Sequence, residues 1–368
     1  MSGAASNPLT VLATAAPELP AAEAARVVRE HWGIIASCTE LVSERDQNFR
    51  LETADGGRFV LKIANAAEDP VVTDFQIQAL LHIERYLEGE RAPLSAPQIL
   101  PDRNGEPRVV LEIDGVQHSA RIVTYLEGVL LADTVLSDVL CRHLGGFLAH
   151  LGLALQGFEH PGSRQALLWD MQQAPQLRGL LSCIANDETG AAVAQSLDAF
   201  ERHALPLFPS LRKQVIHNDF NPGNVLIEAQ DPTAVAGVID FGDMLQSPLV
   251  VDVAVAASYL RVLEGDPLRH IAAFLAGYHA VRRLQTAEIE VLFELIKARL
   301  CATIAILCWR ASVKGEDDPY LQNVATTESS AENFLGRLVH IPAHHARLVF
   351  RQVCASVDAT RPERAENI

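Results

Sequence analysis

The sequence predicts an α+β protein with two unlike lobes, a strand-rich first lobe and a mostly helical second lobe. Two turn signals, Asp55-Gly56-Gly57 and Asp114-Gly115, each separate two runs of apolar and β-branched residues, which is typical of β-hairpins. From about residue 130 onward, apolar residues recur mainly at helical spacing. The 368 residues suit two domain-sized units of roughly 100–200 residues each.

The first lobe, expected over residues 21–126, is predicted to be a five-stranded antiparallel sheet with one inserted helix. A leading helix over residues 21–31 follows from its alanine content and an acid near its start. Apolar residues at helical spacing predict the inserted helix over residues 72–87. The alanine- and proline-rich residues 1–20 are expected to be a frayed tail. The strands are expected over residues 33–42, 49–53, 58–63, 107–113 and 116–125.

The second lobe is expected over residues 127–368. One β-hairpin interrupts its helices, because two short apolar runs, 224–227 and 234–240, flank a polar loop with Asp231-Pro232. Helices are expected over residues 133–155, 191–203, 249–263, 267–283, 286–313, 331–338 and 342–355.

The composition excludes several classes of protein. With 49% hydrophobic and 21% charged residues, the chain is neither disordered nor collagen-like nor a coiled coil. A net charge of −16 argues against a nucleic acid polymer or an anionic membrane as partner. No apolar run is long enough to span a bilayer, and the first residues lack the features of a signal peptide. Six cysteines without a Cys-x-x-Cys pair fit free thiols, so we expect a cytoplasmic protein.

The stretch that carries chemistry contains His217-Asn218-Asp219, then Asn224, and then Asp240-Phe241-Gly242 at the end of the predicted hairpin. Phosphoryl transfer needs a hydroxyl held in line with a γ-phosphate and counter-charge for the phosphate oxygens. Asp219 can accept the hydroxyl proton or orient the hydroxyl, so we expect it to be catalytic. Asn224 and Asp240 offer the neutral and charged oxygens that suit Mg²⁺ beside phosphate oxygens. The alternative is an Asx-rich turn next to an unrelated aspartate.

Three further residues, His217, Asp243 and Lys62, have roles that the motif alone leaves open. We expect His217 to pack and form hydrogen bonds that hold the loop, rather than to transfer protons. Asp243 could contact a metal, a substrate ammonium or neither. Lys62 lies in an apolar strand, where its ammonium is costly to bury unless it meets anions such as phosphate oxygens. The alternative for Lys62 is an edge strand from which it reaches solvent.

The nucleotide is expected to contact two further segments of the first lobe. The connection between the first two strands resembles in its place the phosphate loop of kinases, but it contains no Gly-x-Gly-x-x-Gly. Backbone N–H groups would therefore bind the phosphates together with the side chains of Ser43, Gln47 or Asn48. Thr124 and Leu126 lie where a nucleotide base would bond to the backbone between the lobes.

These motifs resemble those of the aminoglycoside phosphotransferase and choline kinase-like superfamily, which shares the bilobal protein kinase-like fold. The resemblance runs from about residue 39 to residue 311. It implies that Asp219 is the catalytic acid/base, that Asn224 and Asp240 bind Mg²⁺, and that Lys62 contacts the α- and β-phosphates. Hydroxylysine kinases and related phosphotransferase domains look most similar over residues 43–49, 60–63 and 240–244.

The sequence departs from the family pattern at two places. The helix that should pair with Lys62 lacks a clear glutamate, and either Asp74 or Gln76 could replace it. No Ala-Pro-Glu segment follows Asp-Phe-Gly, which argues against a peptide acceptor. By resemblance, Asp252 in the next apolar helix is expected to brace the catalytic loop, since a buried charge needs hydrogen bonds.

We therefore expect a kinase that uses Mg²⁺ and ATP or GTP to phosphorylate a hydroxyl of an amino acid-like or amino alcohol acceptor, with hydroxylysine favoured. Homoserine, choline-type and aminoglycoside acceptors are alternatives. A catalytically inactive nucleotide-binding protein is an alternative of another class. Arg299 and Arg310 could receive a substrate carboxylate, or they could form ion pairs between helices.

Overall fold

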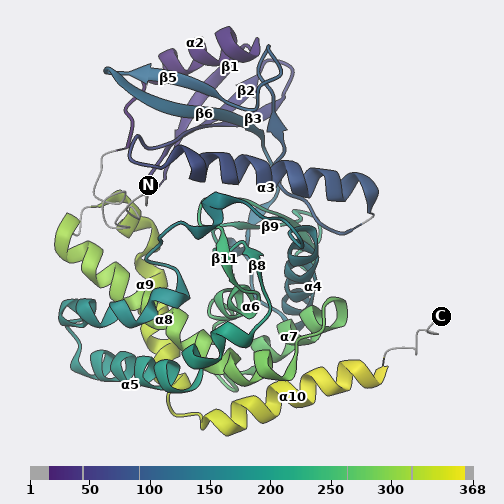
Figure 1. Cartoon of the computed structure of the whole chain (residues 1–368), viewed down its shortest axis with the longest axis vertical. Helices are drawn as coiled ribbons and strands as arrows, with labels where there is room; N and C mark the ends of the chain where they lie inside the picture. Colours follow the sequence, from purple (N-terminus) through teal and green to yellow (C-terminus); the bar gives the residue numbers. More distant parts are fainter. Residues whose placement is uncertain (1–15, 44, 91, 263, 316–317, 361–368) are drawn as a thin grey trace.

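The computed structural model describes residues 16–360 except 44, 91, 263 and 316–317, and it consists of two lobes (Figure 1). An antiparallel sheet with helices α2 (Ala21–Trp32) and α3 (Pro70–Gly89) forms the first lobe. The larger second lobe consists mainly of helices. The expected α+β fold class is therefore confirmed.

The sheet of the first lobe contains the five expected strands and one further short strand. The strands pair antiparallel in the order β1-β2-β3-β6-β4, and β5 also pairs with β6. Strand β4 has only 2 residues, too few for an alternating pattern to reveal it in the sequence. The bounds are β1 (Ala36–Leu41), β2 (Gln47–Thr53), β3 (Arg58–Ile63), β4 (Ile99–Leu100), β5 (Val109–Ile113) and β6 (Val116–Thr124).

Both predicted hairpins form. Between β5 and β6, Asp114 and Gly115 have φ values of 50° and 80°. Positive φ at both central residues is the conformation of a type I′ turn, which matches the twist of the flanking strands. In the β2–β3 turn, Gly56 has a φ of 87°, which glycine adopts at little cost.

The two helices of the first lobe lie on opposite faces of the sheet (Figure 1). Helix α2 buries Val28 and Trp32 against the sheet, and the indole N–H of Trp32 donates to the Leu100 carbonyl at 3.1 Å. Helix α3 lies between the sheet and the second lobe. It begins at Pro70, and the Asp69 side chain caps it by accepting the Val71 N–H at 2.9 Å.

The predicted tail falls mostly on residues 1–15, which lie outside the described residues. Leu19, however, is only 8% exposed and packs in the core of the first lobe. Its N–H and carbonyl bond to the Gln47 side chain at 2.8 and 3.0 Å. The end of the expected tail is therefore anchored to strand β2.

The second lobe holds the expected helices with shifted ends. In addition, residues 171–183 form 3-10 turns, which were not predicted. The apolar residues of this segment do not recur at α-helical spacing. The helices are α4 (Asp138–Ala154), α5 (Asp187–His203), α6 (Val250–Ala257), α7 (Arg269–Val281), α8 (Thr286–Lys314), α9 (Pro319–Leu338) and α10 (Ala343–Thr360), and the 3-10 segments are Leu131–Asp133, Pro161–Arg164, Met171–Cys183 and Leu205–Ser210.

Two small sheets of the second lobe flank the segments that contain His217-Asn218-Asp219 and Asp240-Phe241-Gly242. One is three-stranded, in the order β10-β9-β7, and contains the predicted hairpin. The other pairs β11 with β8. The strands are β7 (Val129–Leu130), β8 (Lys213–Ile216), β9 (Val225–Ile227), β10 (Val235–Val238) and β11 (Leu245–Pro248).

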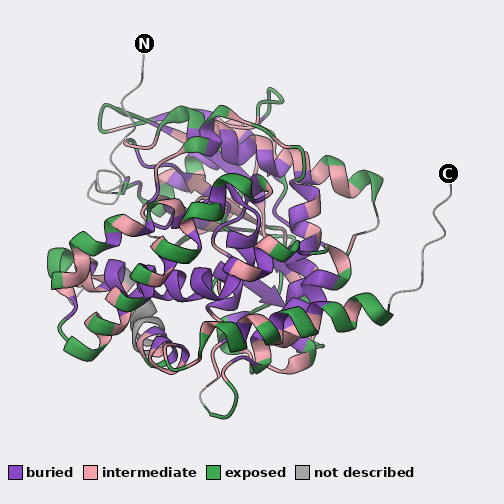
Figure 2. Ribbon diagram, turned by 60° about the horizontal axis from the view of Figure 1, so that its bottom comes forward, coloured by how far each residue is buried: buried purple, intermediate pink, exposed green. Residues whose placement is uncertain are grey.

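Buried residues run through the centre of the second lobe, and exposed residues face outward on the peripheral helices (Figure 2). Helix α8 is buried over most of its length, which explains why its apolar residues show little preference for one side. Within the part of the chain that the structure covers, no helix combines the length and apolarity needed to cross a membrane.

Helices α4 and α7 approach so closely that their backbones touch. A Cβ atom on Gly145 would overlap the carbonyl oxygen of Phe274, and one on Gly277 would overlap the carbonyl of Arg142. Gly146, the neighbour of Gly145, differs, because its nearest neighbour would be a Val281 methyl at 3.8 Å, an ordinary contact. The crossing of α4 and α7 thus requires glycine at positions 145 and 277, but not at position 146.

We expect Gly145→Ala or Gly277→Ala to lower the free energy of unfolding by about 1–3 kcal/mol or more, because the added methyl group forces the helices apart. Gly146→Ala is the matched control and should be neutral or raise stability by up to about 1 kcal/mol. Urea unfolding followed by circular dichroism measures the difference. Equal stability of the Gly145 and Gly146 variants would contradict the close crossing.

Candidate active site

The loop between β8 and β9 carries Asp219 and is fixed by a buried carboxylate from helix α6. Asp252 accepts the backbone N–H of Asn218 at 2.7 Å and that of His217 at 3.1 Å, one with each oxygen. Asp252 is 4% exposed, and burial raises the pKa of its carboxyl. Asn218 is also held in the left-handed region, with a φ of 64°. The bracing role expected for Asp252 is therefore confirmed.

His217 links this loop to the Asp-Phe-Gly segment. Its Nδ1 accepts the Asp219 N–H at 3.3 Å, so Nε2 carries the proton and donates to the Ile239 carbonyl at 3.2 Å. The ring packs edge-on against Phe241, with 4.8 Å between centroids. Burial lowers the pKa of His217, which keeps the imidazole neutral. As expected, His217 holds the loop by packing and hydrogen bonds.

The carboxylate of Asp219 is held by three side chains. Asn224 Nδ2 donates to Oδ2 at 2.6 Å, and Asn221 Nδ2 and Arg299 Nη2 donate to Oδ1 at 2.8 and 3.4 Å. Burial, followed by the charge of nearby Asp243, raises the pKa of Asp219 to about 7. A carboxyl group with this pKa is suited to receive a hydroxyl proton near neutral pH.

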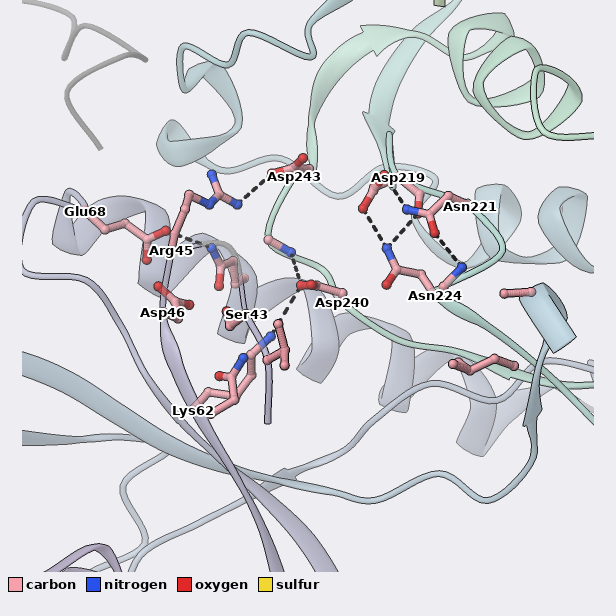
Figure 3. Close-up of a pocket in the computed structure, with 17 residues that line it drawn as sticks. Ser43, Arg45, Asp46, Lys62, Glu68, Asp219, Asn221, Asn224, Asp240 and Asp243 are labelled. Carbon is pink, nitrogen blue, oxygen red and sulfur yellow. Dashed lines mark hydrogen bonds and ion pairs between the residues drawn. The ribbon is translucent and has the colours of Figure 1, made fainter. Parts of the chain in front are cut away.

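Asn224 and Asp240 face each other across the cavity as oxygen donors (Figure 3). Asn224 Nδ2 donates to the carbonyl and to Oδ2 of Asp219, so Oδ1 is the Asn224 atom that could act as a metal ligand. Asp240 has a φ of 61°, and nearby Lys62 keeps the pKa of its carboxyl well below the usual range, so it is ionised. One amide oxygen and one carboxylate beside an open polar space fit Mg²⁺, which retains water and phosphate ligands.

Lys62 extends from β3 toward Asp240, with 3.3 Å between Nζ and Oδ1. Strand β3 lies between β2 and β6, so the alternative of an edge-strand lysine is wrong. The side chain is 16% exposed and lines the cavity. In the structure this ammonium pairs with a carboxylate, and in the same position it could bind phosphate oxygens.

Neither expected helix residue pairs with Lys62. Asp74 turns toward the second lobe, where its carboxylate lies 3.1 Å from His160 Nε2. Gln76 accepts a hydrogen bond from Arg121 at 2.5 Å, and Arg121 stands directly opposite Lys62 on β6. Asp240, and not a residue of helix α3, therefore pairs with Lys62. The pattern of the helix in the sequence could not indicate this contact.

Two adjoining cavities lie where these groups converge. The polar one has a volume of about 560 Å³ and contains Asp219 and Asp243, and the more apolar one has a volume of about 440 Å³. Lys62, Asn224 and Asp240 line both. Apolar side chains from both lobes line the second cavity: Leu41, Val60, Leu80, Val123, Leu226, Ile239 and Phe241.

Of the residues expected at the nucleotide, all but one line these cavities. Ser43 lines the polar cavity, Asn48 lines both, and Thr124 and Leu126 line the apolar one. Gln47 does not point there, because its side chain bonds to the Leu19 backbone and to Glu40. The expectation for Gln47 is thus corrected: alternation along β2 turns it away from Asn48.

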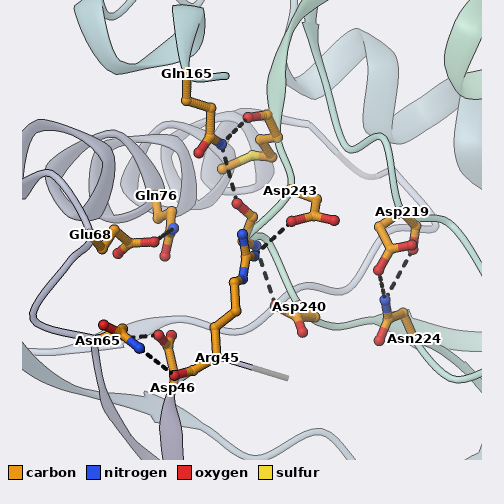
Figure 4. Close-up of polar contacts among 12 residues, drawn as sticks. Arg45, Asp46, Asn65, Glu68, Gln76, Gln165, Asp219, Asn224, Asp240 and Asp243 are labelled. Atoms are coloured by element: carbon orange, nitrogen blue, oxygen red, sulfur yellow. Dashed lines mark hydrogen bonds and ion pairs between the residues drawn. The ribbon is translucent and has the colours of Figure 1, made fainter. Parts of the chain in front are cut away.

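A polar network that the sequence did not predict joins the β1–β2 loop to the segment after Asp-Phe-Gly (Figure 4). Arg45 Nη2 lies 2.7 Å from Asp243 Oδ1. Gln165 Nε2 holds the same segment by donating to the carbonyls of Gly242 and Met244 at 3.2 and 2.6 Å. These partners are far apart in the chain, so no local spacing signals them.

Glu68 also lines the polar cavity and was missed. It accepts hydrogen bonds from Thr73 Oγ1 at 2.8 Å and Gln76 Nε2 at 3.3 Å. Burial, followed by the charge of Asp46, raises the pKa of the Glu68 carboxyl. In the sequence, Glu68 stands just before Asp69-Pro70, a pattern that indicates the start of a helix. This pattern gives no sign that Glu68 lines the cavity.

The two arginines of helix α8 have different roles. Arg299 is 1% exposed, contacts Asp219, and lies over the Trp169 ring with 4.6 Å from Cζ to the centroid. Arg310 pairs with Asp318 at 3.2 Å, which agrees with the alternative that it forms an ion pair. Only Arg299 therefore lies at the site.

We expect Asp252→Asn to lower the free energy of unfolding by about 1–3 kcal/mol, because one loop N–H loses its acceptor in a buried place. Asp252→Ala should cost more, since both N–H groups are then left without partners. Denaturant unfolding measures both, with the exposed Asp231→Asn as control. A change within about 0.5 kcal/mol for Asp252→Ala, the range of ordinary surface substitutions, would contradict the bracing role.

Comparisons with known proteins place the chain in a family. The family model described as Phosphotransferase enzyme family matches residues 37–289. Hydroxylysine kinase from Danio rerio is 27% identical over 318 residues, which cover 83% of this chain and 88% of that protein. Homoserine kinase from Methylorubrum populi is 30% identical over 256 residues, which cover 67% of this chain and 72% of that protein.

A solved structure, that of the microcompartment-associated aminopropanol kinase, has the same fold. It superposes with a TM-score of 0.65 at 18% identity, and the match covers 85% of this chain and 94% of that chain. The family resemblance predicted from the motifs is confirmed, since the family model spans well over half of the residues. The chain belongs to the phosphotransferase enzyme family.

Proposed function

We propose that the chain is a small-molecule kinase that transfers the γ-phosphate of ATP or GTP to a hydroxyl of an amino acid-like or amino alcohol acceptor. The observation that carries this proposal is the convergence of Asp219, Asn224, Asp240 and Lys62 on one polar cavity. These are the residue types that phosphoryl transfer needs. Membership of the phosphotransferase family supports the same class of reaction.

In the proposed reaction, the acceptor oxygen forms a bond to the γ-phosphorus while the bond from that phosphorus to the β,γ-bridging oxygen breaks. The electron pair of the broken bond leaves with the nucleoside diphosphate, and the hydroxyl proton passes to Asp219. Asn221, Asn224 and Arg299 hold the Asp219 carboxylate in place for this transfer. Positioning of this kind supplies much of the rate enhancement in phosphoryl transfer.

The nucleotide is proposed to lie across the two cavities. Its base would enter the apolar cavity beside Thr124 and Leu126, and its phosphates would reach Lys62 in the polar cavity. Asn224 and Asp240 are proposed to hold Mg²⁺, which when bound neutralises charge on the phosphate oxygens. In this proposal, residues 21–126 bind most of the nucleotide.

The proposed acceptor class rests on the relatives and on the charge of the cavity. Hydroxylysine and homoserine, named in two relatives, are both hydroxylated amino acids with an ammonium group. Hydroxylysine is favoured because the relative so named matches 83% of this chain, against 67% for the homoserine kinase. The carboxylates lining the polar cavity outnumber its cations, which favours a cationic acceptor: the acids are Asp46, Glu68, Asp219, Asp240 and Asp243, and the cations are Arg45 and Lys62.

Substitution of Asp219 tests the reaction. We expect Asp219→Asn to lower kcat about 10²–10⁴-fold, because the acceptor hydroxyl loses its proton acceptor. The affinity for a non-hydrolysable nucleotide should change little, since Asp219 faces the acceptor side. Asp231→Asn, on an exposed hairpin loop, is the control. Full turnover by Asp219→Asn would rule out this mechanism.

Substitution of Lys62 tests the nucleotide site. We expect Lys62→Met to weaken nucleotide binding about tenfold or more, because a charge-assisted hydrogen bond to phosphate is lost. Lys213→Met, at an exposed position on β8, should bind nucleotide as the wild type does. Isothermal titration calorimetry with AMP-PNP and Mg²⁺ measures both. Equal affinities would place the phosphates elsewhere.

A panel of acceptors tests the substrate class. In the presence of AMP-PNP and Mg²⁺, hydroxylysine should raise the thermal midpoint more than homoserine, choline or an aminoglycoside. Phosphate transfer from ATP and from GTP is then measured for each compound that binds. Transfer to none of them would favour the alternative of an inactive nucleotide-binding protein.

A further inference from the structure

The ion pair between Arg45 and Asp243 joins the two lobes beside the polar cavity (Figure 4). Arg45 comes from the β1–β2 loop of the first lobe, and Asp243 follows Asp-Phe-Gly in the second. Their nitrogen and oxygen lie 2.7 Å apart, and the side chains are 19% and 10% exposed. Both line the cavity that contains Asp219.

Each partner is carried by an anchored segment. Gln165 fixes the backbone on both sides of Asp243 through its hydrogen bonds to two carbonyls. Asn65 donates its side-chain amide to the Arg45 carbonyl at 3.1 Å. The guanidinium lies against the chain at Gly242, where a Cβ atom would be 3.1 Å from Nη2. The pair therefore joins two anchored segments, and an exchange of partners requires movement of the two side chains and not of the backbone.

The two partners face different ends of the cavity. Asp243 lies between Arg45 and Asp219 in both close-up views (Figures 3 and 4). In the proposed function, Asp219 marks the acceptor end of the cavity, and Lys62 with its partner Asp240 marks the phosphate end. Asp243 therefore belongs to the acceptor end, and Arg45, on its far side from Asp219, is assigned to the phosphates.

Each partner suits a ligand of a different charge. A guanidinium binds phosphate oxygens in a two-pronged geometry, and a carboxylate binds an ammonium group. A ligand that arrives alone must break the ion pair and separate the other partner from the counter-charge that it contacts at 2.7 Å. When both ligands bind, both charges find partners, so each ligand lowers the cost of binding the other.

We propose that Asp243 binds the ammonium group of the acceptor and that Arg45, which exchanges Asp243 for the nucleotide phosphates, couples the binding of the two substrates. This inference rests on the proposed function and adds to it an acceptor subsite and a linkage between the substrates. An acceptor without the ammonium group gains nothing from bound nucleotide.

Isothermal titration calorimetry tests the coupling without any turnover. The probes are 5-hydroxylysine and two analogues, 2-amino-5-hydroxyhexanoic acid and 6-amino-5-hydroxyhexanoic acid, each of which lacks one of its amines. Each probe is titrated into the full chain with and without AMP-PNP and Mg²⁺. We expect AMP-PNP to tighten hydroxylysine binding on the order of tenfold. The analogue that lacks the amine bound by Asp243 should show no such gain.

Variants of both partners separate the two halves of the proposal. Arg45→Gln releases Asp243, so hydroxylysine alone should bind more tightly than to the wild type, and AMP-PNP should add less than about twofold. Asp243→Asn should bind hydroxylysine about tenfold more weakly in the presence of AMP-PNP and lose the preference for the amine. Arg26→Gln and Asp231→Asn, both exposed and outside the site, are the matched controls.

Thermal melting checks that each variant is folded. Should a neutral variant be unstable, Arg45→Lys serves instead, since it keeps the charge but loses the planar guanidinium, and the coupling should fall without vanishing. The proposal is overturned if AMP-PNP leaves hydroxylysine affinity unchanged in the wild type. It is equally overturned if none of the probes binds, or if Asp243→Asn retains the wild-type preference for the amine. Failure of the kinase function appears separately, as full turnover by Asp219→Asn.

Discussion

The arrangement of the site depends on one buried carboxylate. Asp252 accepts two successive backbone N–H groups of the loop after β8, which would otherwise be buried without partners. These hydrogen bonds stabilise the left-handed conformation of Asn218 and thereby the direction in which Asp219 leaves the loop. His217 extends the constraint to the facing hairpin through the Ile239 carbonyl. A polar cavity at the lobe boundary is thus held in shape by Asp252 and His217, which do not themselves line it.

Charge organises the space above this loop. Among the residues that line the polar cavity, two ion pairs cross from the first lobe to the second, Lys62 with Asp240 and Arg45 with Asp243. In both, the first lobe supplies the cation and the second lobe the carboxylate. In the proposed function, the anionic phosphates and the cationic acceptor carry the opposite pattern, so they would replace these contacts rather than add to them. The same residues would then set both the geometry of the site and its binding preference.

Local patterns in the sequence predicted most of the fold and the centre of the site. The hairpins follow from their glycine turns, and Asp219, Asn224 and Asp240 follow from a spacing that phosphoryl transfer dictates. The two-residue strand β4 was too short to show a period. Contacts between distant segments, such as those of Arg45 and Gln165, leave no local signal. The prediction that Gln47 contacts the nucleotide was wrong because its side chain binds the backbone of Leu19. Leu19 lies in a segment for which the sequence predicted no helix or strand.

Trp169 stacks on the guanidinium of Arg299, and its carbonyl accepts Nη1 of the same side chain at 3.4 Å. Arg299 in turn contacts Asp219, so the indole lies two side chains from the reacting groups. Indole emission responds to charge beside the ring, and the chain has only 3 tryptophans. The indole is thus an intrinsic fluorophore linked to Asp219 through one side chain, and a change of charge at Asp219 should alter its emission without an added label.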